Sequence, residues 1–182
     1  MDPTDTDTEG RVIVITGAMA AGKSTVAALL AEKLPRSVHV RGDAFRRMVV
    51  HGRADMTPQP SPEAEAQLQL RYDLAAHTAS TFAEHGFDAI VQDMVIGADL
   101  ASFIERIRAR QRFLVVLSPT VSALEWREEQ RAKAGYVHFS PAVLDDVLRR
   151  ETAHIGYWLD SSTQTPEETV ADILANLETA RV

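Results

Sequence analysis

The order of apolar and polar positions along the chain predicts alternating strands and helices. Five short apolar runs are typical of strands, at residues 11–16, 37–41, 87–92, 113–117 and 155–159. Between them, apolar residues recur at the spacing of amphipathic helices, in segments 22–34, 43–50, 62–85, 100–107, 124–127, 140–148 and 165–177. This alternation predicts an α/β fold with three layers, α/β/α, in which helices flank a five-stranded parallel sheet. Ligands of such sheets bind at the carboxyl ends of the strands, so the residues after each strand are the candidates for chemistry.

Turn and capping residues divide the chain between these elements. The segment 51–62 contains one glycine and three prolines, which predicts an exposed loop. Ser61-Pro62 and Thr165-Pro166-Glu167-Glu168 have the pattern of helix N-termini, and Gly86 stands where a glycine ends a helix. Residues 1–10 are rich in Asp and Thr without apolar periodicity, which predicts a disordered tail before a single domain at 11–182.

A phosphate-binding motif follows the first apolar run directly. Residues Gly17 to Ser24 read Gly-Ala-Met-Ala-Ala-Gly-Lys-Ser, the Walker A pattern, in which backbone N–H groups turn toward a polyphosphate at a helix N-terminus. We expect Lys23 to reach the β- and γ-phosphates of ATP and the Ser24 hydroxyl to bind Mg²⁺. The residues expected to bind the nucleotide here are Gly17, Ala20, Ala21, Gly22, Lys23, Ser24 and Thr25.

Composition and charge narrow the class of protein. The chain of 182 residues has a formal net charge of −7 at pH 7, which argues against a protein that coats nucleic acid, because such binding depends on neutralising phosphates. It contains no cysteine, which excludes disulfides and zinc–thiolate sites. No apolar run has the length of a membrane span, and the acidic start does not resemble a signal peptide, so we expect a cytoplasmic protein without membrane contact.

The residues that accompany the Walker A motif separate motors, switches and kinases. The Asn/Thr-Lys-x-Asp element with which GTP switches read guanine does not occur in this sequence. Motor ATPases usually carry adjacent Asp-Glu after a long apolar strand, whereas the third strand here ends Gln92-Asp93-Met94. Because the glutamate that activates water is missing, the sequence favours phosphoryl transfer to another acceptor.

Asp43 is the candidate for the catalytic base. It follows the second predicted strand, at the same sheet edge as the phosphate-binding loop, where a carboxylate can approach both Mg²⁺ and the γ-phosphate. We therefore assign it a role as base and as metal ligand. An alternative is that Asp43 is only the N-cap of the following helix, a position where Asp is common.

Basic residues on the helix before Gly135 predict a helical lid at about residues 127–141. Arg131 would clamp the γ-phosphate oxygens in the transition state, and Arg127 would contact the nucleotide, for example flat against adenine. Lys133 adds a third positive charge. The alternative is a solvated helix face, because three nearby glutamates stand at spacings that suit ion pairs with these residues.

Three further residues are candidates for binding the acceptor. Asp93 follows the third strand and would contact Mg²⁺ through water or the acceptor itself, or else serve a structural role. Arg46 and Arg47 stand one turn beyond Asp43 and would bind an anionic acceptor, unless they belong to a solvated helix face.

Over residues 11–180 the chain resembles the small P-loop kinases of the gluconate kinase, shikimate kinase and adenylylsulfate kinase type. Gly17 to Ser24 looks like their phosphate loop, and Gly42-Asp43 looks like the Asp after their second strand. Residues 131–141, with Arg131, Gly135 and His138-Phe139, are similar to the lid of gluconate kinases. The resemblance also implies that Ser161, Ser162 and Thr163 lie along the adenine.

The chain departs from gluconate kinases in the lid and after the third strand. The lid reads Gly-Tyr-Val-His-Phe in place of Gly-His-Phe, and the third strand ends without the basic residue of their acceptor site. That ending is more similar to the chloramphenicol phosphotransferase branch, and Asp43 followed by arginine resembles zeta-toxin-type kinases. The resemblance therefore implies the catalytic class and leaves the acceptor open.

The sequence as a whole predicts a kinase that uses ATP and Mg²⁺ to phosphorylate a hydroxyl of a small-molecule acceptor, such as a sugar acid, a sugar or an antibiotic-like compound. We expect a monomer or a homodimer, and we consider nucleic acid an unlikely partner. Two alternatives remain open: a kinase of nucleic-acid ends or nucleotides, and a toxin-type or regulatory nucleotide-binding module.

Overall fold

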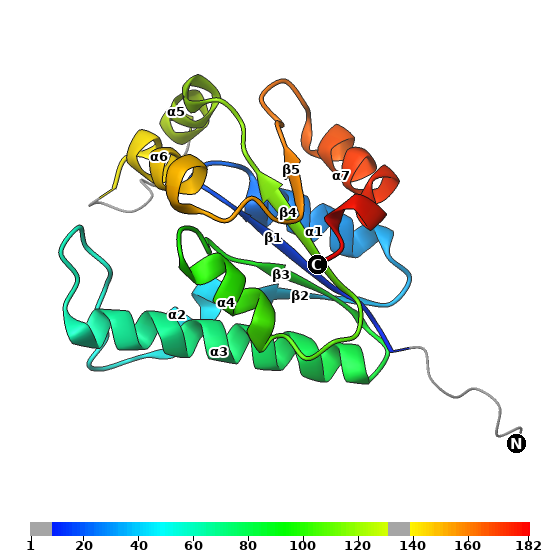
Figure 1. Cartoon of the computed structure of the whole chain (residues 1–182), viewed down its shortest axis with the longest axis horizontal. Coiled ribbons are helices and arrows are strands. Elements are labelled where there is room, and N and C mark those ends of the chain that lie inside the picture. The colour runs from blue at the N-terminus through cyan, green and yellow to red at the C-terminus, as the bar shows by residue number, and fades with distance from the viewer. Residues whose placement is uncertain (1–8, 131–138) are drawn as a thin grey trace, which may run out of the picture.

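A computed structural model describes residues 9–130 and 139–182 (Figure 1). The strands are β1 (Val12–Gly17), β2 (Ser37–Arg41), β3 (Asp88–Gln92), β4 (Arg112–Leu117) and β5 (Tyr157–Leu159). The helices are α1 (Lys23–Lys33), α2 (Gly42–Met48), α3 (Pro62–Glu84), α4 (Asp99–Arg106), α5 (Val121–Glu129), α6 (Pro141–Glu151) and α7 (Pro166–Ala175), followed by the 3-10 helix η1 (Leu177–Ala180). The predicted alternation of strands and helices is therefore confirmed.

The five strands form one parallel sheet in the order β2-β3-β1-β4-β5. The chain leaves β1 toward one edge of the sheet and returns from β2 across β3 toward β4 and β5. Because parallel crossovers are right-handed, this reversal places α1 on one face and α3 and α4 on the other. Helix α7 packs beside α1, which completes the three layers (Figure 1). The fold class predicted from the sequence is confirmed.

The core follows from the position of each strand in the sheet. Every residue of the central strand β1 is buried, as are residues 113–117 of its neighbour β4. The edge strands β2 and β5 are only partly buried. Uninterrupted apolar runs are typical of strands covered on both faces, which explains why the central strands had the clearest sequence signal.

Helix ends lie where the capping residues predict them. Thr165 and Glu168 form a reciprocal capping box at the start of α7, and the Ser61 side chain accepts from the Ala64 N–H at the start of α3. Gly86, with φ of 76°, follows the end of α3. The last strand begins at Tyr157, two residues later than its apolar run, because Gly156 turns the chain with φ of 70°.

The predicted tail and lid fall largely on residues that the structure does not describe, which are 1–8 and 131–138. Of the expected tail, Glu9 forms an ion pair with Arg110, and the Gly10 N–H donates to the Ala83 carbonyl. These two residues therefore pack against the domain. In the described part of the chain, no helix has the length and apolar character needed to cross a membrane.

The starts of β1 and β3 are joined by an ion pair whose effect on stability depends on pH. The Arg11 backbone N–H and Nε both donate to Asp88 Oδ1, at 3.0 and 2.9 Å, and Nη2 donates to Oδ2. Burial alone would raise the pKa of Asp88, but the hydrogen bonds and charge of Arg11 outweigh it and hold that pKa below its usual range. An ionised Asp88 therefore stabilises the folded state.

We predict that the free energy of unfolding falls as the pH drops from about 4, where Asp88 titrates in the unfolded chain, through its lower folded pKa. Asp88→Asn should lower the free energy of unfolding by about 2 kcal/mol at pH 7, and the free energy of the variant should change less as the pH drops below about 4. Urea unfolding at pH 7, 4 and 3 measures both effects. Asp146→Asn, which removes an exposed ion pair with Arg150 on α6, is the matched control and should change little. If the stability of Asp88→Asn falls with pH as steeply as that of the wild type, Asp88 is not the source of the pH dependence.

Candidate active site

The backbone of the phosphate-binding loop has left-handed conformations that favour glycine. Gly17 has φ of 144°, and a Cβ at this position would overlap the Leu117 carbonyl of β4. Ala20 is the only described residue other than glycine with positive φ, at 64°. Such conformations cost about 1 kcal/mol for a residue with a Cβ and collect at ligand-binding sites. The loop thus turns sharply at the carboxyl end of β1.

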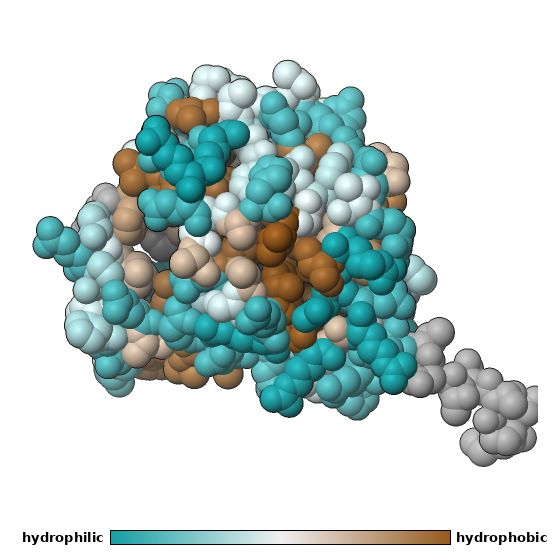
Figure 2. Space-filling view, in the orientation of Figure 1, coloured by the Kyte–Doolittle hydropathy of each residue, from teal (hydrophilic) through white to brown (hydrophobic). Residues whose placement is uncertain are grey.

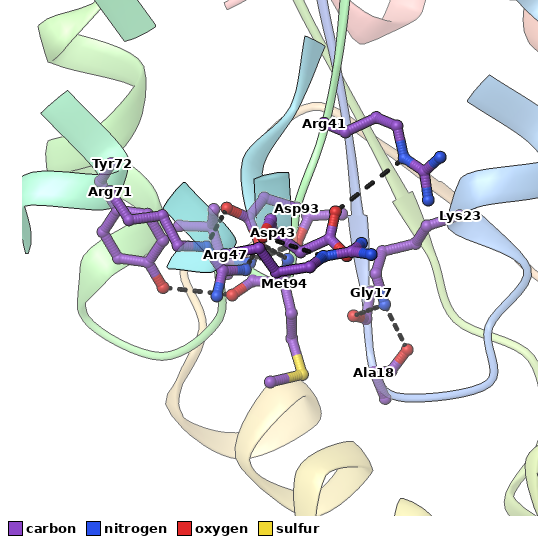
Figure 3. Close-up of polar contacts among 12 residues, drawn as sticks. Gly17, Ala18, Lys23, Arg41, Asp43, Arg47, Arg71, Tyr72, Asp93 and Met94 are labelled. Atoms are coloured by element: carbon purple, nitrogen blue, oxygen red, sulfur yellow. Dashed lines mark hydrogen bonds and ion pairs between the residues drawn. The ribbon is translucent and has the colours of Figure 1, made fainter. Parts of the chain in front are cut away.

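Lys23 lies across this loop at the first position of α1. Its Nζ donates to the carbonyls of Gly17 at 2.9 Å and Ala18 at 2.8 Å (Figure 3). Gly22 precedes the helix and provides no side-chain cap, so the N–H groups of the first turn have no partner from such a cap. An anion in the loop would meet these N–H groups and the Lys23 ammonium together.

A cleft of about 850 Å³ adjoins the loop and joins it to α5 and to the segment between β5 and α7. The predicted nucleotide residues that line it are Ala20, Ala21, Gly22, Thr25, Arg127, Ser162 and Thr163. We call it the nucleotide cleft. Ser161, which the resemblance also places along the adenine, lines this cleft as well, and its buried Oγ has no hydrogen bond among the described residues.

Arg127 connects the walls of the nucleotide cleft. Its Nη2 donates to the Ser161 carbonyl at 2.6 Å, and its Nη1 donates to the Ala21 carbonyl at 3.4 Å. Burial lowers the pKa of the Arg127 guanidinium, and the nearby Asp160 carboxylate partly opposes this. Neither of these two hydrogen bonds is the alternative pairing with a glutamate of the same helix. Nucleotide contact by Arg127 stays a prediction.

Asp43 is the second residue of α2, and the N-cap of that helix is Arg41. The alternative that Asp43 is only an N-cap is therefore wrong. Its carboxylate pairs with Arg47, and Arg41 Nε lies 3.9 Å from Oδ1. Oδ1 is buried, and the described residues offer it no hydrogen bond. In Figure 3 the carboxylate points to the side of the site where Lys23 and Gly17 lie.

Asp93 belongs to a buried ion pair with Arg71 of α3. Arg71 Nε donates to Asp93 Oδ2 at 2.7 Å, Arg71 Nη2 pairs with Oδ1, and the Met94 N–H donates to the same Oδ1 at 2.7 Å. The Asp93 and Arg71 side chains are 1% and 8% exposed. Both carboxylate oxygens thus have partners inside the protein, and the predicted contact with acceptor or Mg²⁺ stays untested.

The same carboxylate positions the start of α2. A Cβ on Gly42 would overlap the Asp93 side chain, so only glycine allows α2 to begin this close to β3. Gly42 immediately precedes Asp43. Asp93 therefore fixes the backbone that carries the candidate base.

Arg46 and Arg47 diverge although they are adjacent. Arg47 pairs with Asp43, whereas Arg46 Nη2 lies 2.7 Å from Asp55 Oδ1 in the loop after α2. Both have anionic partners within the protein. Arg131, the predicted transition-state clamp, lies outside the described residues.

Arg71 is the residue that sequence reasoning missed. It falls on the buried face of α3, at helical spacing from Ala64, Leu68 and Ala75. An arginine in such a stripe needs an anionic partner, because an unpaired buried charge is costly. A charged residue in an otherwise apolar helix face was therefore the sequence feature that could have predicted a buried ion pair at Arg71.

Comparison with known proteins now assigns the chain to a family. The profile of the AAA domain family AAA_33 matches residues 12–154. The chain belongs to this family. Comparison with curated proteins finds no match.

Solved structures show that this AAA domain has the fold of small P-loop kinases. It is similar to a sugar kinase from Janibacter sp. HTCC2649, with TM-score 0.66 and 19% identity over 94% of this chain and 96% of that one. It is also similar to the APS kinase CysC of Mycobacterium tuberculosis, with TM-score 0.67 and 19% identity over 94% and 99%. A third is the tunicamycin resistance protein of Deinococcus radiodurans, with TM-score 0.65 and 15% identity over 95% and 98%.

We predict that Arg71→Met destabilises the AAA domain by about 3 kcal/mol, because it leaves the Asp93 carboxylate buried without its cation. The double variant Arg71→Met/Asp93→Asn should recover most of this loss, since it removes both charges. Urea unfolding of the wild type, both single variants and the double variant measures the coupling. If the double variant is no more stable than Arg71→Met, the pair does not account for the stability of this site.

Proposed function

We propose that the protein is an ATP-dependent phosphotransferase that moves the γ-phosphoryl group to a hydroxyl of a small molecule. The observation that carries this proposal is the position of Asp43. Its carboxylate follows β2, its Oδ1 has no hydrogen bond in the described part of the chain, and the phosphate-binding loop follows β1 at the same sheet edge.

The strand order supports transfer to an acceptor. Because β3 lies between β1 and β2, the loop and α2 start about 10 Å apart, two strand spacings. That separation leaves room for a γ-phosphoryl group and an acceptor hydroxyl between Lys23 and the candidate base. In this arrangement Asp43 would take the proton of the hydroxyl as its oxygen attacks phosphorus.

The residues around the loop would hold the phosphates and the metal. Lys23 would exchange its carbonyl contacts for phosphate oxygens, and the first-turn N–H groups of α1 would bind the β-phosphate. The Ser24 hydroxyl and a carboxylate oxygen of Asp43 are hard oxygen donors that suit Mg²⁺. Magnesium, when bound, supplies positive charge to the phosphates. The described residues contain no cluster of three His, Cys, Asp or Glu that would form an independent metal site.

The nucleotide cleft would hold the base of ATP. Ser162, Thr163 and Arg127 line the cleft, and Ser162 Oγ accepts from the Thr120 N–H at 2.8 Å, which fixes the cleft wall. The predicted lid at 127–141 would close over the phosphates and exclude water, with Arg131 as its clamp.

We predict that Lys23→Ala abolishes transfer and that Asp43→Asn lowers kcat about a hundredfold, the contribution of a general base. The measurement is ADP release stimulated by each member of a panel of sugars, sugar acids, nucleosides and antibiotic-like alcohols. Asp146→Asn on the exposed side of α6 is the matched control. Near-normal kcat in Asp43→Asn with a verified acceptor would remove Asp43 from the base role.

For Arg131→Ala we expect a lower kcat with little change in ATP affinity, because the clamp would act on the γ-phosphoryl group mainly in the transition state. Steady-state kinetics and equilibrium titration with a non-hydrolysable ATP analogue separate the two quantities. Arg150→Ala, which removes an exposed arginine of α6, is the control. A loss confined to ATP affinity would make Arg131 a nucleotide-binding residue instead.

A further inference from the structure

A second pocket, with a volume of about 370 Å³, opens beside α2. Its walls come from α2 and the loop after it, from α3, from the segment between β3 and α4, and from the start of α6. Phe45 and Met94 line it, and these residues are close in sequence to Asp43 and Asp93. We call it the apolar pocket. Asp43 does not line the pocket, but it stands two residues before Phe45 on the same helix.

The side chains of this pocket are mainly apolar and adaptable. Three of the chain's five methionines, Met48, Met56 and Met94, line it together with Leu68, Ile96 and Phe139. Unbranched thioether side chains adjust to the shape of a ligand. Figure 2 shows apolar atoms reaching the surface along α3, and Leu70 and Leu74, which line the pocket, are 51% and 39% exposed.

The charged and amide side chains at the pocket are already engaged inside the protein. Arg46 pairs with Asp55, and Arg71 pairs with Asp93. Asp99 Oδ1 accepts from Gln69 Nε2 at 3.0 Å.

The fourth such side chain, Gln67, joins the loop after α2 to α3. Its Nε2 donates to the Gly52 carbonyl at 2.8 Å, and its Oε1 accepts from the Ala54 N–H at 2.9 Å. An anionic or polyhydroxylated ligand buried among the apolar side chains would leave many of its polar groups without partners, which is costly. An apolar body has no such groups to satisfy.

We propose, on the basis of the proposed function, that the acceptor is an uncharged compound with an apolar aromatic or alkyl body and a terminal hydroxyl, bound in the apolar pocket. The body fills the pocket between α2 and α3, and the hydroxyl lies at the end next to Asp43. The volume suits a single small molecule. The proposal predicts that sugar acids, sugars and nucleosides are poorer acceptors than such compounds.

Binding of alcohols to the whole protein tests this without any turnover. Dissociation constants are measured by calorimetry for a series of primary alcohols from 1-propanol to 1-octanol, for 3-phenyl-1-propanol, and for glucose, gluconate and adenosine. Each added methylene should lower the dissociation constant about fourfold until the pocket is full. A constant that does not change with chain length, or tighter binding of gluconate or glucose, overturns the proposal.

Matched variants locate the binding. Met56→Gln in the loop and Met94→Gln after β3 should each weaken binding of 3-phenyl-1-propanol about tenfold. Leu174→Gln, at an exposed apolar position on α7, should have no effect. Circular dichroism verifies folding, and having two pocket variants guards against a defect in one. Equal affinity in all folded variants overturns the site assignment.

The proposed function can be contradicted independently of the pocket assignment. With ATP present, alcohols that bind in the pocket should stimulate ADP release, and the product should be a phosphate monoester. Binding with the expected chain-length dependence but without phosphorylation would support the pocket and contradict the kinase. Phosphorylation of gluconate in preference to any alcohol would support the kinase and contradict the pocket.

Discussion

The buried ion pair between Arg71 and Asp93 organises the side of the site away from the phosphate-binding loop. Asp93 is a carboxylate at the end of a central strand, and removing it from water is costly unless its charge is matched. Arg71 matches it from α3, and the Met94 N–H adds a third contact. The chain at Gly42 then packs directly on this carboxylate, which sets where α2 starts and so where Asp43 stands.

The pair therefore links the core to the proposed chemistry through backbone geometry. The end of β1 is connected to the same region by Thr16, whose hydroxyl donates to the Val95 carbonyl at 2.7 Å and accepts from the Val95 N–H at 3.0 Å. Both contacts hold the segment after β3 beside the phosphate-binding loop. The loop and Asp43, which would cooperate in the proposed transfer, are thus positioned against a common element.

The fold could be predicted from the sequence because the patterns that specify it are local or periodic. Apolar runs such as 113–117 identify buried strands, and capping at Thr165 or glycine at Gly86 fixes helix ends within a few residues. The Walker A motif likewise predicts a loop from eight consecutive residues. Alternation of strands and helices then leaves few topologies, since crossovers have one hand.

The partners within the site could not be predicted in this way, because they join residues far apart in the chain. Arg71 and Asp93 are 22 positions apart, and Arg127 and Ala21 are 106 positions apart. Nothing at Asp93 itself distinguishes a metal ligand from the partner of a buried arginine. The apolar pocket is missed for the same reason, since its walls come from four separate stretches of the chain.

The side chains that line the two cavities suit two different ligands, a nucleotide in one and an apolar acceptor in the other. A nucleotide is recognised through directed contacts, and its cleft is lined by hydroxyl groups and by Arg127. An apolar acceptor makes no directed contacts along its body, so area and shape must align it. Arg46, Arg71 and Asp99 pair within the protein, so in the proposed complex the acceptor hydroxyl would be directed toward Asp43, which stands two residues before Phe45 on α2.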